Sequence, residues 1–159
     1  MRIIGIDPGL VHTGIGIIDY DGFKLKKVFC SVINTNTKVS ISERLAILYK
    51  DIFRIMQTYN PNVCSIEKVF VNMNPESSLK LGLARGVALC VPAIYGIEVF
   101  EYTPNKVKKT VVGNGHATKD QIGKMVQVLL GGVLEKKDAA DALAIAICHA
   151  NHTNAVRLV

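Results

Sequence analysis

Four acidic residues stand where a carboxylate is costly, which makes them the first candidates for chemistry. Asp7 and Glu67 each end a short apolar run that is typical of a buried strand. Asp138 and Asp141 lie three residues apart at the start of an apolar helix, so they share one face of it. Because a buried carboxylate without a partner costs free energy, the four acids together predict a site.

Carboxylates that meet at one edge of a sheet repel one another unless cations neutralise them. Their hard oxygen atoms favour Mg²⁺ or Mn²⁺. Two such ions about 3.5–4 Å apart can bind the attacking water and the leaving oxygen of a phosphodiester. Lysine and arginine number 19 against 13 aspartate and glutamate, a formal net charge of +6, which favours nucleic acid as the partner.

Simpler interpretations exist for the same acids. Asp7 begins an Asp-Pro-Gly sequence, which is common in turns. Asp138 is a candidate N-cap with Asp141 in the first helical turn, where acids suit the helix dipole. Asp141 is nevertheless followed by an apolar helix and has no cationic partner nearby in the sequence, which favours a site.

The elements that would position these acids follow an α/β order. Apolar runs and the Asp21-Gly22 turn predict three antiparallel strands, over 2–7, 13–19 and 25–33. Pro92 is expected to stop the second helix, and Arg44 to lie on the solvent side of the first. Helical crossovers favour parallel pairing, so we expect an α/β fold with a mixed five-stranded sheet flanked by helices. The remaining predictions are helices over 40–59, 77–91, 104–112, 118–130 and 138–150, and strands over 63–67 and within 94–102.

Length and composition predict one domain over residues 1–159, without a linker or repeat. The four cysteines are widely spaced and mostly in apolar runs, which predicts reduced core thiols in a cytoplasmic protein. Asp7 and Pro8 interrupt any signal peptide, and no apolar run is expected to be long enough to span a membrane.

Five segments of the chain together carry a family resemblance. They are Gly5-Ile6-Asp7-Pro8-Gly9 with Thr13-Gly14, Ile66-Glu67-Lys68-Val69-Phe70, 79–88, 107–113 and 138–144. In this order, and over nearly the whole chain, they resemble the RuvC family of bacterial Holliday-junction resolvases. The resemblance implies an RNase H-like fold, a homodimer and magnesium-dependent paired nicking of four-way DNA junctions in recombination and repair. It implies two Mg²⁺ ions per active site, for which Mn²⁺ can substitute, and a role downstream of the RuvA–RuvB branch-migration complex.

The resemblance also implies roles for single residues. Some members carry histidine at the third acidic position, which here is Asp138. The family's base-stacking aromatic falls on Phe70, and its two important lysines fall on Lys108 and Lys119. The catalytic acids, which are also the metal ligands, fall on Asp7, Glu67, Asp138 and Asp141.

Phe70, Lys108 and Lys119 have simpler interpretations too. An aromatic residue after a strand usually belongs to the core, and lysines on helices are usually solvated. Phe70, however, follows Glu67 by three residues and precedes the polar loop 72–74, where it could stack on an unpaired base.

Three rival functions share parts of this pattern. The segment from Asp7 to Gly14 also resembles the first phosphate loop of actin-like and sugar-kinase ATPases, which normally need two such domains. A binding module that has lost catalysis is opposed by the four intact acids. A nuclease acting on RNA–DNA hybrids is opposed only by the family resemblance.

The helix over 77–91 is apolar on more than one face, which exceeds what packing on a sheet needs. Gly82 and Gly86 would let two such helices approach closely. We therefore expect one strip to cover the sheet and the other to form a homodimer interface. The strips are Leu79, Leu83, Val87 and Cys90 on one side, and Leu81, Ala84, Ala88 and Val91 on the other.

Overall fold

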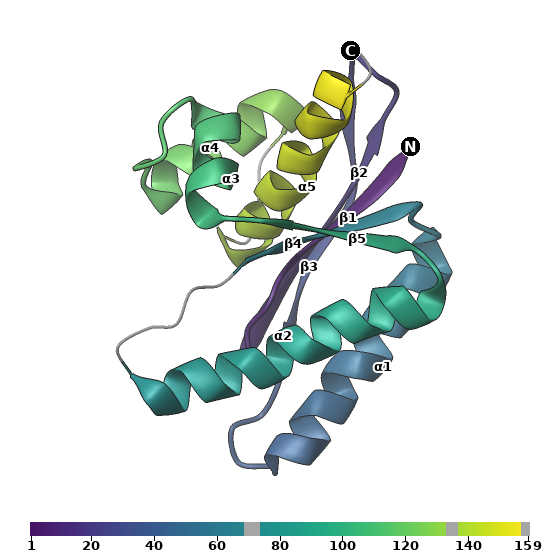
Figure 1. The fold of residues 1–159 in the computed structure, drawn as a ribbon, viewed down its shortest axis with the longest axis vertical. Coiled ribbons are helices and arrows are strands. Elements are labelled where there is room, and N and C mark those ends of the chain that lie inside the picture. The colour runs from purple at the N-terminus through teal and green to yellow at the C-terminus, as the bar shows by residue number, and fades with distance from the viewer. Residues whose placement is uncertain (69–73, 133–136, 157–159) are drawn as a thin grey trace.

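A five-stranded mixed sheet with the order β3-β2-β1-β4-β5 forms the centre of the computed structural model (Figure 1). The structure describes residues 1–68, 74–132 and 137–156, with the backbone alone at 137, 138 and 154–156. The first three strands pair antiparallel, whereas β4 is parallel to β1 and β5 to β4, so the expected mixed sheet is confirmed. The strands are β1 (Arg2–Asp7), β2 (His12–Tyr20), β3 (Leu25–Asn34), β4 (Val63–Glu67) and β5 (Glu98–Tyr102).

Helices cover both faces of this sheet (Figure 1). On one face α1 (Ile41–Tyr59) and α2 (Pro75–Tyr95) bury a core with one side of β1, β2 and β4. On the other face α5 (Lys137–Val156) lies against the sheet, and α3 (Pro104–Val112) and α4 (Lys119–Leu130) pack on α5. Capping boxes at Ser40 and Thr118 begin α1 and α4.

Side-chain alternation along β1 decides which face its terminal acid occupies. Ile4 and Ile6 belong to the core under α1 and α2, whereas Ile3 belongs to the core under α5. Because successive side chains point to opposite faces of a strand, Asp7 falls on the α5 face. The core thus aims the first acid toward the helix that carries Asp141.

Two glycines let α5 lie directly on the strands. Gly5 of β1 and Gly16 of β2 are paired in register. A Cβ atom at Gly5 would lie 2.1 Å from the carbonyl oxygen of Ala142, and one at Gly16 would lie 2.6 Å from the amide nitrogen of Leu143. Only glycine at these two positions permits the observed approach, which fixes the height of α5 above the sheet.

Pro92 does not stop α2, contrary to the sequence prediction. The helix continues through Pro92 to Tyr95 and ends at Gly96, which adopts a left-handed conformation with φ of 90°. A proline removes only its own N–H donor, and the last turn is closed instead by the amides of Gly96 and Ile97, which donate to Ala93 and Pro92.

Arg44 is also misplaced by the sequence prediction. Its side chain is buried, with 6% of the residue exposed, although it stands in a helix with a solvent face. Arg44 precedes the buried Leu48 by four residues and Ile52 by eight, so it lies on the inner stripe of α1. The helical spacing of Arg44 from Leu48 and Ile52 indicates a buried position, but the sequence prediction followed the charged residue type instead.

Helix α2 leaves much of its apolar surface exposed. Ala84, Ala88 and Val91 are buried, whereas Leu79 is 66% and Leu83 38% exposed, so one strip is buried, as expected, and the structure shows which of the two it is. Cys90 is exposed rather than in the core; Cys64 and Cys148 are buried, and none of the four cysteines is in a disulfide.

By length and composition α2 is also the one helix in the described residues that could cross a membrane, which the sequence prediction did not foresee. It carries Lys80 and Arg85 in its first half, and Arg85 forms an ion pair with Glu101 of β5. One such helix is weak grounds for a membrane span, and its buried strip packs on α1 and the sheet.

The contact between α5 and the sheet predicts a large penalty for the smallest added side chain. Gly16→Ala should lower the free energy of unfolding by about 1–3 kcal/mol or more, because the new methyl meets backbone atoms of Ala142 and Leu143 as well as the Leu143 side chain. Gly123→Ala in α4 is the control: nothing lies within 4 Å of its Cβ position, so stability should rise by up to about 1 kcal/mol. Urea denaturation measures both, and equal stability of the two variants would contradict the close approach.

Candidate active site

Asp7 and Glu67 lie at the same end of two neighbouring parallel strands. β1 and β4 pair from Ile3 with Val63 to Ile6 with Ile66, so the next residue of each strand is one of the two acids. Both acids stand on the α5 face of the sheet, because each follows the alternation of its strand. The sequence prediction that each of these carboxylates ends a strand is confirmed, and the pairing shows that the two strands are neighbours.

The turn after Asp7 is folded back on itself. The hydroxyl of Thr13 donates to the carbonyl of Gly9 over 2.6 Å. Gly9 lies so close to His12 that a Cβ atom would meet the His12 carbonyl oxygen at 2.2 Å. Thr13 is itself buried, so this turn is held rigidly and presents Asp7 at a fixed place.

Helix α5 brings the third acid to the same edge. Asp141 directly precedes Ala142 and Leu143, whose backbone atoms rest on Gly5 and Gly16. The buried hydroxyl of Ser65 lies 3.3 Å from the carbonyl oxygen of Ile4 and 3.3 Å from that of Ile145, so it links β1, β4 and α5. Three elements remote in sequence are thereby fixed next to one another.

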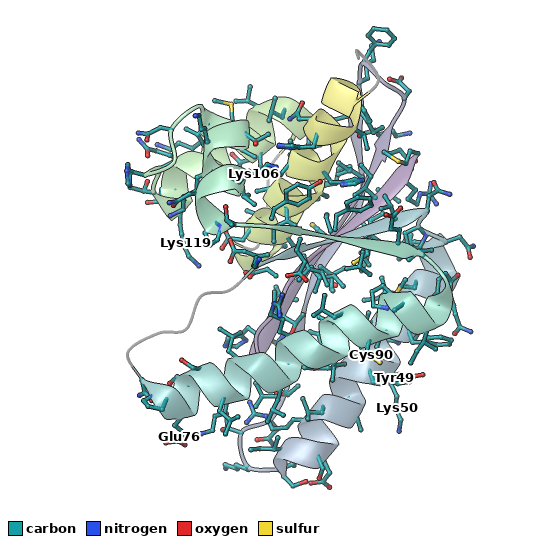
Figure 2. All side chains as sticks on the ribbon, in the orientation of Figure 1. Tyr49, Lys50, Glu76, Cys90, Lys106 and Lys119 are labelled. Carbon is teal, nitrogen blue, oxygen red and sulfur yellow. The ribbon has the colours of Figure 1, made fainter. Side chains whose placement is uncertain are left out.

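These acids share one pocket of about 210 Å³ with two lysines. Lys108 reaches it from α3 and Lys119 from the first residue of α4, and Figure 2 shows Lys119 on the α3–α4 side of the molecule. Five of the seven residues singled out from the sequence therefore meet at one place. The full lining is Asp7, Glu67, Pro104, Val107, Lys108, Lys119, Ile122, Asp141 and Ala144.

Lys119 holds Asp141 by an exposed ion pair. The Lys119 Nζ atom lies 3.1 Å from Asp141 Oδ2, with 75% of the lysine side chain exposed but only 20% of the aspartate. Exposed ion pairs contribute about 0–1 kcal/mol, so a cation in the pocket can displace this lysine at small cost. No local pattern in the sequence indicates this pairing, because the partners are far apart in the chain.

The electrostatics of Glu67 show how crowded the acids are. Burial raises the pKa of the Glu67 carboxyl above its ordinary value, and the negative charge of Asp141 raises it further. The positive charges of Lys108 and Lys119 lower the pKa in part. A carboxyl with a raised pKa in a pocket with a second acid is a common feature of functional sites.

The donor set fits a hard divalent cation. Asp7, Glu67 and Asp141 offer carboxylate oxygens, and no histidine or cysteine lines the described pocket, which suits Mg²⁺ or Mn²⁺. Within residues 1–68, 74–132 and 137–156, no three acidic, histidine or cysteine side chains converge closely enough to hold one ion as they stand. A bound cation would neutralise the repulsion between Glu67 and Asp141 and would replace Lys119 as the partner of Asp141.

Two predicted site residues are not placed by the structure. Asp138 is the second residue of α5, one turn before Asp141, so its backbone is helical and it is not the N-cap; its side chain lies outside the described residues. Phe70 also lies outside the described residues. Their roles remain predictions.

The raised pKa of Glu67 gives a pH-dependent stability. The folded chain holds the Glu67 proton more tightly than the unfolded chain, so ionised Glu67 destabilises the fold as pH rises through its pKa. In chelator, Glu67→Gln should therefore have a higher free energy of unfolding than the wild type at pH 7, and the gain should vanish near pH 4.

Glu98→Gln, at the exposed start of β5, is the matched control and should show no such gain. Added Mg²⁺ should stabilise the wild type more than Glu67→Gln, because the ion binds the carboxylate. If Glu67→Gln were less stable than the wild type at pH 7 in chelator, burial and the charge of Asp141 would not be destabilising the ionised Glu67 carboxylate.

Known proteins are similar to this chain over nearly its full length. The family model described as crossover junction endodeoxyribonuclease RuvC matches residues 3–149. The RuvC protein of Acidiphilium cryptum is 51% identical over 152 residues, covering 95% of this chain and 91% of the relative. That of Rhodospirillum rubrum is 48% identical over 153 residues, covering 96% and 90%.

Solved structures are similar to this chain in the same way as the sequences. The RuvC of Thermus thermophilus, in a complex with a Holliday junction substrate, superposes with a TM-score of 0.92 at 30% identity, covering 98% of this chain and 96% of that one. The yeast mitochondrial Holliday junction resolvase Ydc2 has the same fold at 14% identity and a TM-score of 0.67. The sheet order and flanking helices are those of an RNase H-like fold. This chain belongs to the RuvC family of crossover junction endodeoxyribonucleases.

Proposed function

We propose that this chain resolves four-way (Holliday) DNA junctions by hydrolysing phosphodiester bonds at paired, symmetric positions, in recombination and DNA repair. The observation that carries the proposal is the pocket in which Asp7, Glu67 and Asp141 meet Lys108 and Lys119. Membership of the RuvC family over residues 3–149 favours this reaction over an ATPase and over a binding module.

The acids supply the metal-binding and catalytic groups. Asp7, Glu67 and Asp141, with Asp138 one helical turn before Asp141, would hold two Mg²⁺ ions, for which Mn²⁺ can substitute. Such ions, when bound, activate the attacking water and stabilise the charge on the leaving oxygen. The rigid turn after Asp7 and the seating of α5 keep these carboxylates in place, so little reorganisation accompanies the reaction.

The two lysines and Phe70 act on the DNA itself. Lys108 and Lys119 would contact phosphates beside the bond that is cut, and Lys119 would leave Asp141 for a phosphate once a cation binds there. Phe70 would stack on a base opened at the crossover. Its position two residues after Lys68, where β4 has ended beside the pocket, supports that role.

The exposed strip of α2 supports a homodimer. A four-way junction has two-fold symmetry, and one site makes one nick, so a two-fold pair of chains matches the two nicks needed. Leu79 and Leu83 are exposed on α2, and nothing lies within 4 Å of the Cβ positions of Gly82 and Gly86. A second copy of α2 can therefore approach this face closely.

The same proposal places the protein in the cytoplasm, where it acts on junctions that the RuvA–RuvB branch-migration complex has moved. The family description, crossover junction endodeoxyribonuclease, supports a DNA junction as the substrate. The net charge of +6 supports DNA binding.

Neutral amides in place of the acids should separate cleavage from binding. Asp7→Asn, Glu67→Gln and Asp141→Asn should each cut a synthetic four-way junction at least about a hundredfold more slowly in Mg²⁺, because transition-state charge is no longer stabilised. Junction binding should persist, since phosphate contacts by lysines hold the DNA. Denaturing gels give the rate, and fluorescence anisotropy gives the affinity.

Asp51→Asn is the control, because Asp51 pairs with Arg54 on the surface of α1, outside the pocket. Duplex DNA and an RNA–DNA hybrid are tested beside the junction. Nicking by Asp7→Asn at the wild-type rate would refute the assignment of the acids, and preferred cutting of the hybrid would refute the substrate.

A charge on the outer strip of α2 should break the dimer. Leu83→Glu should give monomers by light scattering at micromolar concentration, which make single nicks in a cruciform plasmid without the paired second cut. Ile47→Glu on α1 is the matched control, since Ile47 is 37% and Leu83 38% exposed. A wild type that is monomeric at that concentration and still cuts in pairs would overturn the dimer proposal.

A further inference from the structure

A second pocket, of about 370 Å³, lies at the same end of the sheet as the acids but is assigned no part in catalysis. It is formed by the β1–β2 turn, the connection from β3 to α1, the first turn of α1 and the first half of α2. Leu10, at one wall, belongs to the core under α1 and α2, so this pocket opens on the face opposite α5. Its lining is Leu10, Val11, Thr37, Arg44, Ser77, Lys80 and Leu81.

Arg44 is the unusual group in this pocket. With 6% of the residue exposed, it donates from Nε to the hydroxyl of Thr35 over 2.9 Å and from Nη2 to the carbonyl of Leu10 over 3.0 Å. Both acceptors are neutral. In the part of the chain that the structure describes, no carboxylate lies within ion-pair distance of Arg44, and Nη1 makes no hydrogen bond.

The surroundings make this cation costly. Arg44 lies in the first turn or so of α1, where the helix dipole is positive and disfavours another positive charge. A buried guanidinium without a counter-charge is unfavourable unless an anion joins it. The fold therefore maintains an unneutralised arginine at the wall of an open pocket, next to the turn that follows Asp7.

Groups around Arg44 suit a phosphate. Lys80 lines the same pocket, and its one ion pair with a described residue is with Glu76, at 2.6 Å. Because 75% of the glutamate side chain is exposed, the lysine is readily available to a stronger anion. The hydroxyls of Ser77 and Thr37 add neutral donors. The guanidinium fork matches two oxygens of one phosphate group.

We propose that this pocket binds a backbone phosphate of the DNA substrate, away from the bond that is cut, through Arg44 with Lys80 and Ser77 beside it. The proposal rests on the proposed function, because a junction nuclease brings a continuous row of phosphates across this end of the sheet. Its site is on the opposite face of the sheet edge from the acids, so it holds the substrate and takes no part in the chemistry.

Arg44 also ties Leu10 to Thr35, so its removal would disturb the fold, and two neighbours give cleaner variants. Lys80→Ala removes one cation from the pocket. Ser77→Asp places a carboxylate beside Arg44, and an acid in the first turn of α2 favours the helix. The controls make the same charge changes at exposed positions of α1: Lys50→Ala, which Figure 2 shows far from the Glu76 end of α2, and Gln57→Glu.

The probe is a fluorescein-labelled four-way DNA junction, titrated in chelator over a salt series. Lys80→Ala and Ser77→Asp should each bind about tenfold more weakly than the wild type. The slope of log affinity against log salt should fall by about one, whereas both controls should match the wild type. Single-turnover cleavage in Mg²⁺ at saturating enzyme should keep its wild-type rate, which a disturbed active site would not allow.

Variants whose affinity and salt slope equal those of their controls would overturn the phosphate site. Inorganic phosphate that raises the Tm of the wild type, together with unchanged junction binding by both variants, would reassign the pocket to a small free anion. A wild type that binds the junction but fails to cut it would refute the proposed function instead, so the two failures are distinct.

Discussion

The contact of the α5 backbone with Gly5 and Gly16 is the constraint on which the active site depends. It lets a helix lie on two paired strands with no side chain between them. Asp141 stands one residue before that contact, and Asp7 two residues beyond Gly5, so the same packing that buries α5 also sets the spacing of the acids. A shift of α5 on the sheet would therefore also move Asp141 relative to Asp7.

That packing forces like charges together, and the protein tolerates the resulting strain. Burial and Asp141 raise the pKa of Glu67, and the exposed Lys119 relieves only part of the repulsion. A weak ion pair is useful here because it keeps Asp141 in place without competing strongly with a metal ion. The pocket therefore keeps a repulsion between carboxylates that the binding of cations and DNA can relieve. Active sites commonly differ from the rest of a fold in this way.

Much of this arrangement was predictable, since strand-ending acids and helical spacing are local properties. The mixed sheet, the α5 helix and the meeting of Asp7, Glu67 and Asp141 follow from such patterns and from the family resemblance, whereas the pairing of β1 with β4 comes from the structure. Buried Arg44 and the helical Pro92 were not predicted, because tertiary contacts override residue type: a guanidinium finds a carbonyl and a hydroxyl, and a proline loses only one donor. The Lys119–Asp141 pair needs three-dimensional proximity that no local pattern contains.

We propose that the seating of α5 brings its acid and the two strand acids into one metal site. A crystal of the protein soaked in Mn²⁺, with anomalous diffraction recorded, locates the ion directly. Anomalous density is expected in direct coordination with Asp7, Glu67 and Asp141. Density elsewhere on the surface, with the pocket empty at saturating Mn²⁺, would contradict it.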